Sequence, residues 1–83
     1  MEQVIEAVRG FLSEKLRIPD AQSIAADLPL LQKGVIDSLE LLQVASFLEK
    51  TFEIPVEDTD VVPSNFRSLA TMAAFVERKR AAR

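Results

Sequence analysis

The chain has 83 residues and a formal net charge of −3, and it contains no Cys, His, Tyr or Trp. The absence of Cys excludes disulfides and thiolate metal sites, and without His, Cys or Tyr the candidate general bases are carboxylates and lysines. This inventory argues against an independent enzyme, and the length predicts one small domain spanning residues 1–83.

No stretch of the sequence carries the roughly 18 uninterrupted apolar residues that a membrane-spanning helix needs. The N-terminal residues, Met1-Glu2-Gln3, lack the basic and then apolar profile of a secretory signal. The sequence therefore predicts a cytoplasmic protein without a membrane span.

The acidic charge is concentrated in the middle of the chain. Residues 34–60 contain seven acidic residues and one lysine, whereas residues 61–83 contain five basic residues and one glutamate. An acidic surface of this kind attracts a basic partner and repels nucleic acid, so we expect protein partners and no nucleic acid. A solvated acidic surface without a partner is the alternative interpretation of the same charges.

Residues 2–16 are predicted to form the first helix, because apolar residues recur there at helical spacing in one stripe: Val4, Ile5, Val8, Phe11 and Leu12. Pro19 disfavours helix at Ile18 and ends the element. Residues 17–37 then form a long loop, in which a short helical turn is expected near residues 21–26. Because apolar residues are interspersed through this loop, we expect it to lie pinned across the helices.

The second helix is predicted over residues 38–52, with an inward stripe of Leu41, Val44, Ala45, Leu48 and Phe52. Asp37 is a good N-cap for this helix, and Glu40 stands where a capping-box acid reaches back to the N–H of the cap. Ser38 therefore falls in the first turn, among unpaired backbone N–H groups at the positive end of the helix dipole. A phosphate ester on Ser38 would be stabilised there, although a simple capping pattern has the same residues.

Leu39 and Leu42 lie off the inward stripe of this helix, beside Ser38. One interpretation is that they are single exposed apolar residues, which are common on protein surfaces. The other is that they form with Ser38 a small apolar patch, rimmed by acids, where a partner docks.

After the second helix, Pro55 biases Ile54 toward extended geometry and ends the element. A short turn or helix is expected over residues 57–62, and another over residues 63–66. Phe66 is the expected anchor of the latter.

The last helix is predicted over residues 69–80, with Ser68 as its cap. Its expected core stripe, flanked by Phe75, is Leu69, Met72, Ala73 and Val76. The basic run Arg78-Lys79-Arg80 complements the C-terminus of this helix, and we interpret it as a solvated tail rather than a nucleic-acid site.

Together these elements predict an all-α fold, a small four-helix bundle of three main helices and a short third helix with a long first loop. The long loop is expected to let the first two helices run in the same general direction.

Four short motifs point to a known family: Gly34, Asp37-Ser38-Leu39 opening the second helix, Phe52-Glu53-Ile54-Pro55 leaving it, and Asn65-Phe66-Arg67-Ser68-Leu69 before the last helix. In a helical chain of this length they resemble the acyl and peptidyl carrier protein family along essentially the whole sequence. The Asp-Ser-Leu motif alone is weak, and its place between this loop and this helix makes it specific.

The resemblance implies that Ser38 is esterified by 4′-phosphopantetheine, which a phosphopantetheinyl transferase donates from coenzyme A with magnesium. The thiol of this arm holds an acyl or aminoacyl group as a thioester, so the cofactor supplies the nucleophile that the chain lacks. The resemblance further implies that Asp37 orients and caps the attachment site, and that the partner-binding face contains Leu39, Glu40, Leu42 and Ser46. A monomer with no catalytic residue and no metal site is expected.

The number of residues between Gly34 and the Asp37-Ser38 pair bears on which group the arm carries, here called the cargo. Two residues, Val35 and Ile36, separate Gly34 from Asp37-Ser38, whereas carriers of fatty-acid synthesis usually have one. Gln43 and Ser46 also stand where an acid and a large apolar residue are common in those carriers.

We therefore favour a stand-alone carrier that an adenylating acyl or aminoacyl ligase loads and that downstream acyl-accepting enzymes unload. Its pathway would be a specialised one, of polyketide or nonribosomal-peptide type or in aminoacyl transfer. The alternatives are an acyl carrier of fatty-acid synthesis and an unmodified helical adaptor that binds a partner through Leu39 and Leu42.

Overall fold

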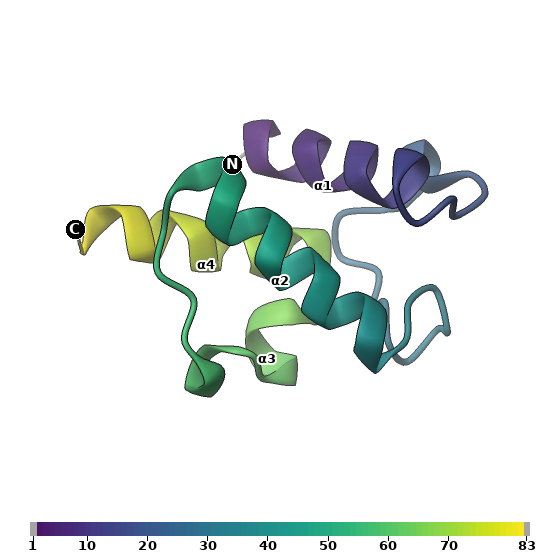
Figure 1. Cartoon of the computed structure of the whole chain (residues 1–83). Coiled ribbons are helices and arrows are strands. Elements are labelled where there is room, and N and C mark those ends of the chain that lie inside the picture. Colours follow the sequence, from purple (N-terminus) through teal and green to yellow (C-terminus); the bar gives the residue numbers. More distant parts are fainter. Residues whose placement is uncertain (1, 83) are drawn as a thin grey trace.

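The computed structural model describes residues 2–82 and shows a bundle of helices (Figure 1). The helices, in chain order, are α1 (Glu2–Glu14), α2 (Ser38–Phe52), α3 (Pro63–Phe66) and α4 (Leu69–Ala81), with short 3₁₀ turns at Ala21–Ser23 and Asp58–Asp60 in the two long connections. No strand occurs within residues 2–82, so the predicted all-α bundle with a short third helix is confirmed. Over the same residues, no helix has the length and apolar character needed to cross a membrane.

The observed bounds of α2 are those predicted, whereas α1 ends two residues before the predicted position. The reason lies in the backbone after the helix. Arg17 adopts a left-handed conformation with φ of 56°, and the N–H of Ile18 bonds back to the carbonyl of Leu12 at 3.0 Å. Such a left-handed residue closes a helix C-terminus by satisfying its last carbonyls.

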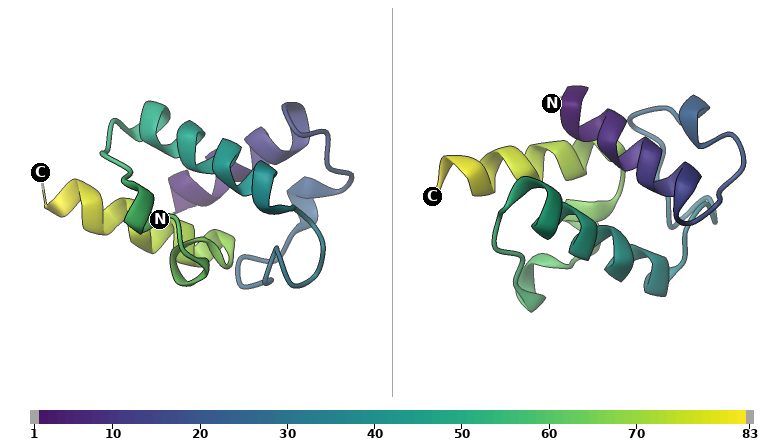
Figure 2. Two further views of the ribbon diagram at one scale, coloured as in Figure 1. Left: turned by 60° about the horizontal axis from the view of Figure 1, so that its bottom comes forward. Right: turned by 45° about the horizontal axis from the view of Figure 1, so that its top comes forward.

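The relative direction of the first two main helices corrects one expectation. α1 runs opposite to both α2 and α4, as the colours in Figures 1 and 2 show, so the expectation that α1 and α2 share a direction was wrong. The connection between α1 and α2 crosses one end of the bundle instead of returning along it. The connection that returns along the bundle is the second one, which contains α3, and for this reason α2 and α4 run the same way.

The core lies where α1, α2 and α4 meet, with α3 packed against α4. The predicted stripes of α2 and α4 are buried, with the exception of Phe52, which is only partly buried at the end of α2. Phe75 is 1% exposed, so it belongs to the centre of the core and not to its flank. Its ring packs against the buried ring of Phe66 with 5.4 Å between centroids.

The long connection between α1 and α2 is pinned to the rest of the fold, as predicted. Leu30 is fully buried, and its N–H bonds to the carbonyl of Arg67 at 2.8 Å. The N–H of Ala70 bonds to the carbonyl of Ala26, also at 2.8 Å. The guanidinium of Arg9 donates to the carbonyl of Ile24 at 2.6 and 3.2 Å. These bonds satisfy backbone groups that a loop crossing a core would otherwise leave unpaired.

The basic run at the end of α4 makes specific contacts, which corrects its interpretation as a solvated tail. Arg78 donates to the amide oxygen of Asn65 at 2.7 Å, and Lys79 pairs with Asp60 at 2.7 Å. Arg80 lies over the ring of Phe52 at 5.9 Å from its centroid. The run therefore ties α4 to the second connection and to the end of α2.

The ion pair between Lys79 and Asp60 predicts an acid-dependent contribution to stability. The hydrogen bond from Lys79, and after it the one from the Glu57 N–H, holds the pKa of the Asp60 carboxyl below its usual value of 3.8. A carboxyl with a lowered folded-state pKa stabilises the fold above its usual pKa, and this contribution is lost as pH falls through the lowered value.

The variant Asp60→Asn cannot titrate at this position. Its deficit in unfolding temperature relative to wild type should therefore be largest near neutral pH and should shrink as pH falls below 3.8. Melting curves of both proteins across this range measure the deficit. A deficit that stays constant with pH would contradict the assignment of this ion pair.

Candidate functional site

The approach to α2 is a tight turn anchored in the core. The Gly34 N–H bonds to the Leu31 carbonyl at 3.1 Å, and the Val35 N–H bonds to the Leu30 carbonyl at 2.9 Å. Gly34 has φ of 73°, a left-handed conformation that glycine adopts without steric cost. Ile36 is 3% exposed and fixes the chain immediately before the helix starts.

Asp37 and Glu40 form the predicted capping box. The Asp37 Oδ1 accepts from the Glu40 N–H at 2.8 Å, and the Glu40 Oε1 accepts from the Asp37 N–H at 3.0 Å. Both carboxylates are thus engaged with the backbone of the first turn. Glu40, predicted to lie on a partner-binding face, is half-buried in this arrangement.

Ser38 is exposed and is the first residue of α2. Its own N–H and that of Leu39 have no hydrogen-bond acceptor among residues 2–82. These free donors lie at the positive end of the dipole of a 15-residue helix. These donors and the dipole would stabilise the negative charge of a phosphate ester on the Ser38 hydroxyl. The hydroxyl makes no hydrogen bond within the described residues, so the ester would displace none.

Loss of the cap should weaken the start of this helix. Asp37→Ala is expected to lower the free energy of unfolding by about 1 kcal/mol, because it removes the acceptor for the Glu40 N–H. Asp37→Asn keeps an acceptor oxygen, so its free energy of unfolding should fall much less. Urea unfolding of the three proteins measures the difference, and equal losses for the two variants would argue against the capping role.

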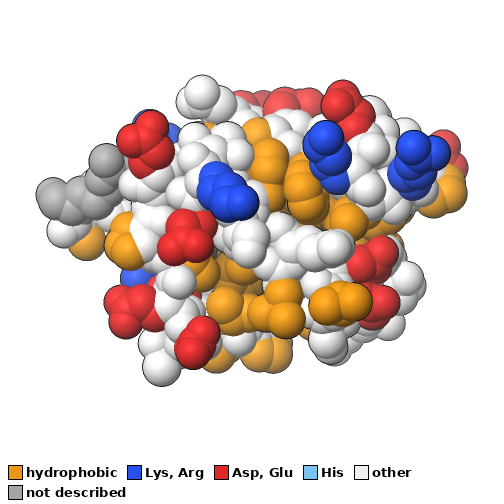
Figure 3. Space-filling view, viewed as in Figure 1, with side chains coloured by type: hydrophobic (Ala, Val, Ile, Leu, Met, Phe, Trp, Pro, Cys, Tyr) orange, Lys and Arg blue, Asp and Glu red, His pale blue; other side chains and the backbone are white. Residues whose placement is uncertain are grey.

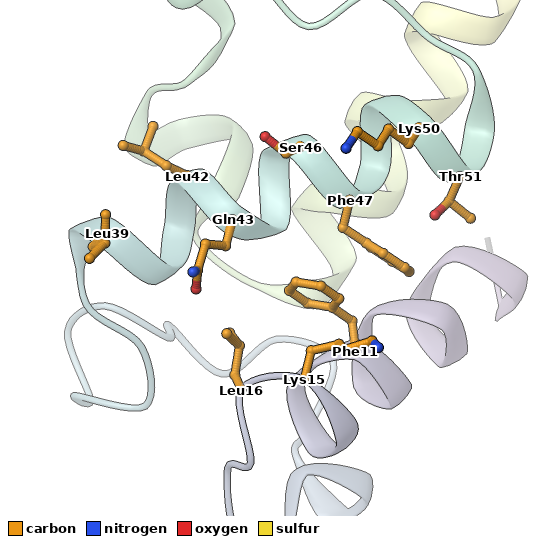
Figure 4. Close-up of a pocket in the computed structure, with 10 residues that line it drawn as sticks. All are labelled: Phe11, Lys15, Leu16, Leu39, Leu42, Gln43, Ser46, Phe47, Lys50 and Thr51. Carbon is orange, nitrogen blue, oxygen red and sulfur yellow. The ribbon is translucent and has the colours of Figure 1, made fainter.

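The other predicted partner-face residues lie together on the outer side of α2. Leu39 and Leu42 are 68% and 52% exposed, and Ser46 is exposed one turn farther along the helix. These three side chains line one wall of a groove between α1 and α2 with a volume of about 600 Å³ (Figure 4). We call it the α1–α2 groove.

Sequence reasoning missed the contribution of α1 to this groove. Its floor holds Phe11 and Phe47, whose rings stack with centroids 4.5 Å apart, and Leu16 lies beside them. Phe11 was assigned to the core, and Phe47 was not singled out. Both are partly buried at the edge of the core, a position that helical spacing alone does not distinguish from full burial.

The acidic rim was expected around the small patch of Ser38, Leu39 and Leu42, and the larger α1–α2 groove has a different charge. Among the described residues that line it, the charged side chains are Lys15 and Lys50. Figure 3 shows apolar surface between the two helices with basic side chains at its edge. No group of three or more metal-ligating residues occurs within residues 2–82.

The fold and the site define a small helical module that presents an exposed serine at the capped start of a helix. The sequence matches the family described as "Phosphopantetheine attachment site" over residues 6–76. The chain belongs to this family. It is therefore a carrier protein and not an enzyme, it bears 4′-phosphopantetheine, and it works with a phosphopantetheinyl transferase and with acyl-handling partners.

Solved structures support the fold. One chain in a structure titled "Crystal structure of FAD-dependent dehydrogenase" superposes with a TM-score of 0.70 at 23% sequence identity. The match covers 83% of this chain and 97% of that chain. A comparison with curated proteins found no match.

Proposed function

We propose that Ser38 is the residue to which the phosphopantetheine arm is attached. The observation that carries this proposal is an exposed hydroxyl beside free N–H donors at a capped helix start. Ser68, which caps α4, is a poor candidate because it is 3% exposed and its hydroxyl accepts from the Thr71 N–H at 3.2 Å. Ser64 is exposed, but it lies in a helix of only four residues.

Attachment would form a bond between the Ser38 Oγ and the phosphorus of the arm and would break the pyrophosphate bond of coenzyme A. The serine proton would be lost, and adenosine 3′,5′-bisphosphate would be the leaving group. The bound arm supplies a thiol that carries an acyl group as a thioester. Of the chain's own residues, Asp37 holds the helix start in place and the first-turn N–H groups stabilise the phosphate charge.

We further propose that an adenylating ligase loads the carrier with an acyl or aminoacyl group for a specialised pathway, and that the protein acts as a cytoplasmic monomer. The spacing of Val35-Ile36 between Gly34 and Asp37 supports this choice over fatty-acid synthesis. The exposed Leu39 and Leu42 support docking of partner enzymes on the outer side of α2.

Intact-protein mass after incubation with coenzyme A, magnesium and a broad-specificity phosphopantetheinyl transferase tests the attachment. The expected result is one added arm, which fragmentation of the peptide containing residues 34–50 places on Ser38. An arm found on another serine would overturn the assignment. A panel of adenylating ligases, each supplied with its own acid and ATP, then tests the mode of loading.

The adaptor alternative draws on the same exposed leucines and predicts binding that does not depend on the arm. Calorimetry that measures the binding of a transferase or ligase to the unmodified and to the arm-bearing protein distinguishes the adaptor from the carrier. If the arm is never added while a partner still binds wild type and not Leu42→Asp, the adaptor interpretation holds and the carrier proposal fails.

A further inference from the structure

The α1–α2 groove begins next to the proposed attachment site and runs along α2. Leu39 follows Ser38 directly and lines one end, and Lys50 and Thr51 line the other (Figure 4). The twelve residue-to-residue steps from Ser38 to Lys50 span about 18 Å of helix. A phosphopantetheine arm has thirteen bonds from phosphorus to sulfur. If each bond adds the same length as in an extended polypeptide chain, the extended arm is about 16 Å long. An arm on Ser38 therefore reaches the far half of the groove.

The walls of the groove suit an apolar group. Leu16 lines the groove from the α1 side and points toward α2, and the stacked rings of Phe11 and Phe47 form its floor. Its volume of about 600 Å³ lies within the range of small-molecule sites. A group tethered at the mouth occupies such a site at high effective concentration, so weak contacts are enough to hold it.

The far half of the groove also offers an unpaired positive charge. Lys50 is the single basic residue in the acidic segment of residues 34–60, and it forms no ion pair within residues 2–82. Lys15 lies on the opposite wall, but it also borders an adjoining hollow that Glu14 lines. Lys50 is therefore the better partner for an anion inside the groove.

We propose that the α1–α2 groove is the resting site of the acyl group carried on the arm, and that it favours an acyl group with an apolar, preferably aromatic, body and a carboxylate at its far end. The inference rests on attachment at Ser38. The apolar body contacts Phe11 and Phe47, and the carboxylate is held by the Lys50 ammonium.

The test uses the full chain carrying stable amide analogues of the loaded arm. Three cargos are compared: a benzoyl group with a para carboxylate, an unsubstituted benzoyl group, and an acetyl group. Nuclear Overhauser effects from the aryl protons to Phe11, Phe47 and Leu16 are expected for both aryl cargos and strongest for the carboxylate. Intact mass of each sample verifies the arm separately, so failure of attachment and failure of the groove are distinct results.

Lys50→Gln tests the charge, with Lys33→Gln as the matched control, since Lys33 is exposed in the first connection and does not line the groove. Lys50→Gln should reduce the occupancy of the carboxylate cargo about threefold and leave the benzoyl cargo unchanged. Lys33→Gln should change neither. Amide shifts far from the groove verify that both variants are folded.

Several outcomes would overturn the inference. Cargo-dependent shifts confined to the first turn of α2 would mean that the acyl group stays in solvent. Contacts to Pro29 and Pro63 would place it in a different hollow, of about 250 Å³, between the first connection and α3. Contacts that vanish on dilution would mean that a second copy provides them. Equal occupancy of the two aryl cargos would refute the preference for a carboxylate.

Discussion

Ser38→Ala is expected to abolish addition of the phosphopantetheine arm. The substitution removes the hydroxyl that would form the phosphate ester, and no other serine combines exposure with the start of a long capped helix. Intact-protein mass should show one added arm on wild type and none on the variant. Ser64→Ala is the matched control, because Ser64 is also exposed near a helix start, and it should be modified at the wild-type rate.

The loss should be one of chemistry and not of folding. The side chain of Ser38 is exposed and makes no hydrogen bond with the described residues, and the cap of α2 is made by Asp37. The free energy of unfolding of Ser38→Ala should therefore stay within about 0.5 kcal/mol of wild type. A folded variant that still gains an arm would show that attachment occurs elsewhere.

Phe66→Ala is expected to have the largest effect on stability, a loss of about 3–5 kcal/mol in the free energy of unfolding. Phe66 is 0% exposed, and its ring packs against that of Phe75. Truncation leaves a cavity at the contact between α3 and α4, where a small domain has few other side chains to fill it. Because such domains have about 5–15 kcal/mol of total stability, this one substitution removes a large share.

Urea unfolding followed by circular dichroism measures this loss. Phe52→Ala is the control, since Phe52 also lies at a helix end but is only partly buried, and it should lose about 1–2 kcal/mol. A loss below about 1 kcal/mol for Phe66→Ala would contradict the observed core. Similar losses for both variants would contradict the observation that Phe66 is fully buried and Phe52 only partly buried.

The parts of the fold that were predicted correctly depend on local chemistry. The bounds of α2, its capping box and the exposure of Leu39 and Leu42 follow from residues within four positions of one another. The exposed position of Ser38 follows from the same local pattern. Its role as the attachment site stays a prediction.

The parts that were missed depend on how the helices meet. The opposed direction of α1 and α2 is set by where the first connection lies, which helical periodicity does not encode. The full burial of Phe75 depends on the position of Phe66 in α3. The α1–α2 groove has the same origin, because Lys15 and Lys50 line one groove only once the two helices lie side by side.

The backbone bonds from Leu30 to Arg67 and from Ala70 to Ala26 have a consequence for molecular recognition. They join the segment that leads to Ser38 with the junction of α3 and α4, so these two parts of the surface keep a fixed spacing. A partner enzyme that touches both meets a preorganised shape and loses little entropy in ordering it. In hydrogen exchange, the amides of Leu30 and Ala70 should open together as one cooperative unit.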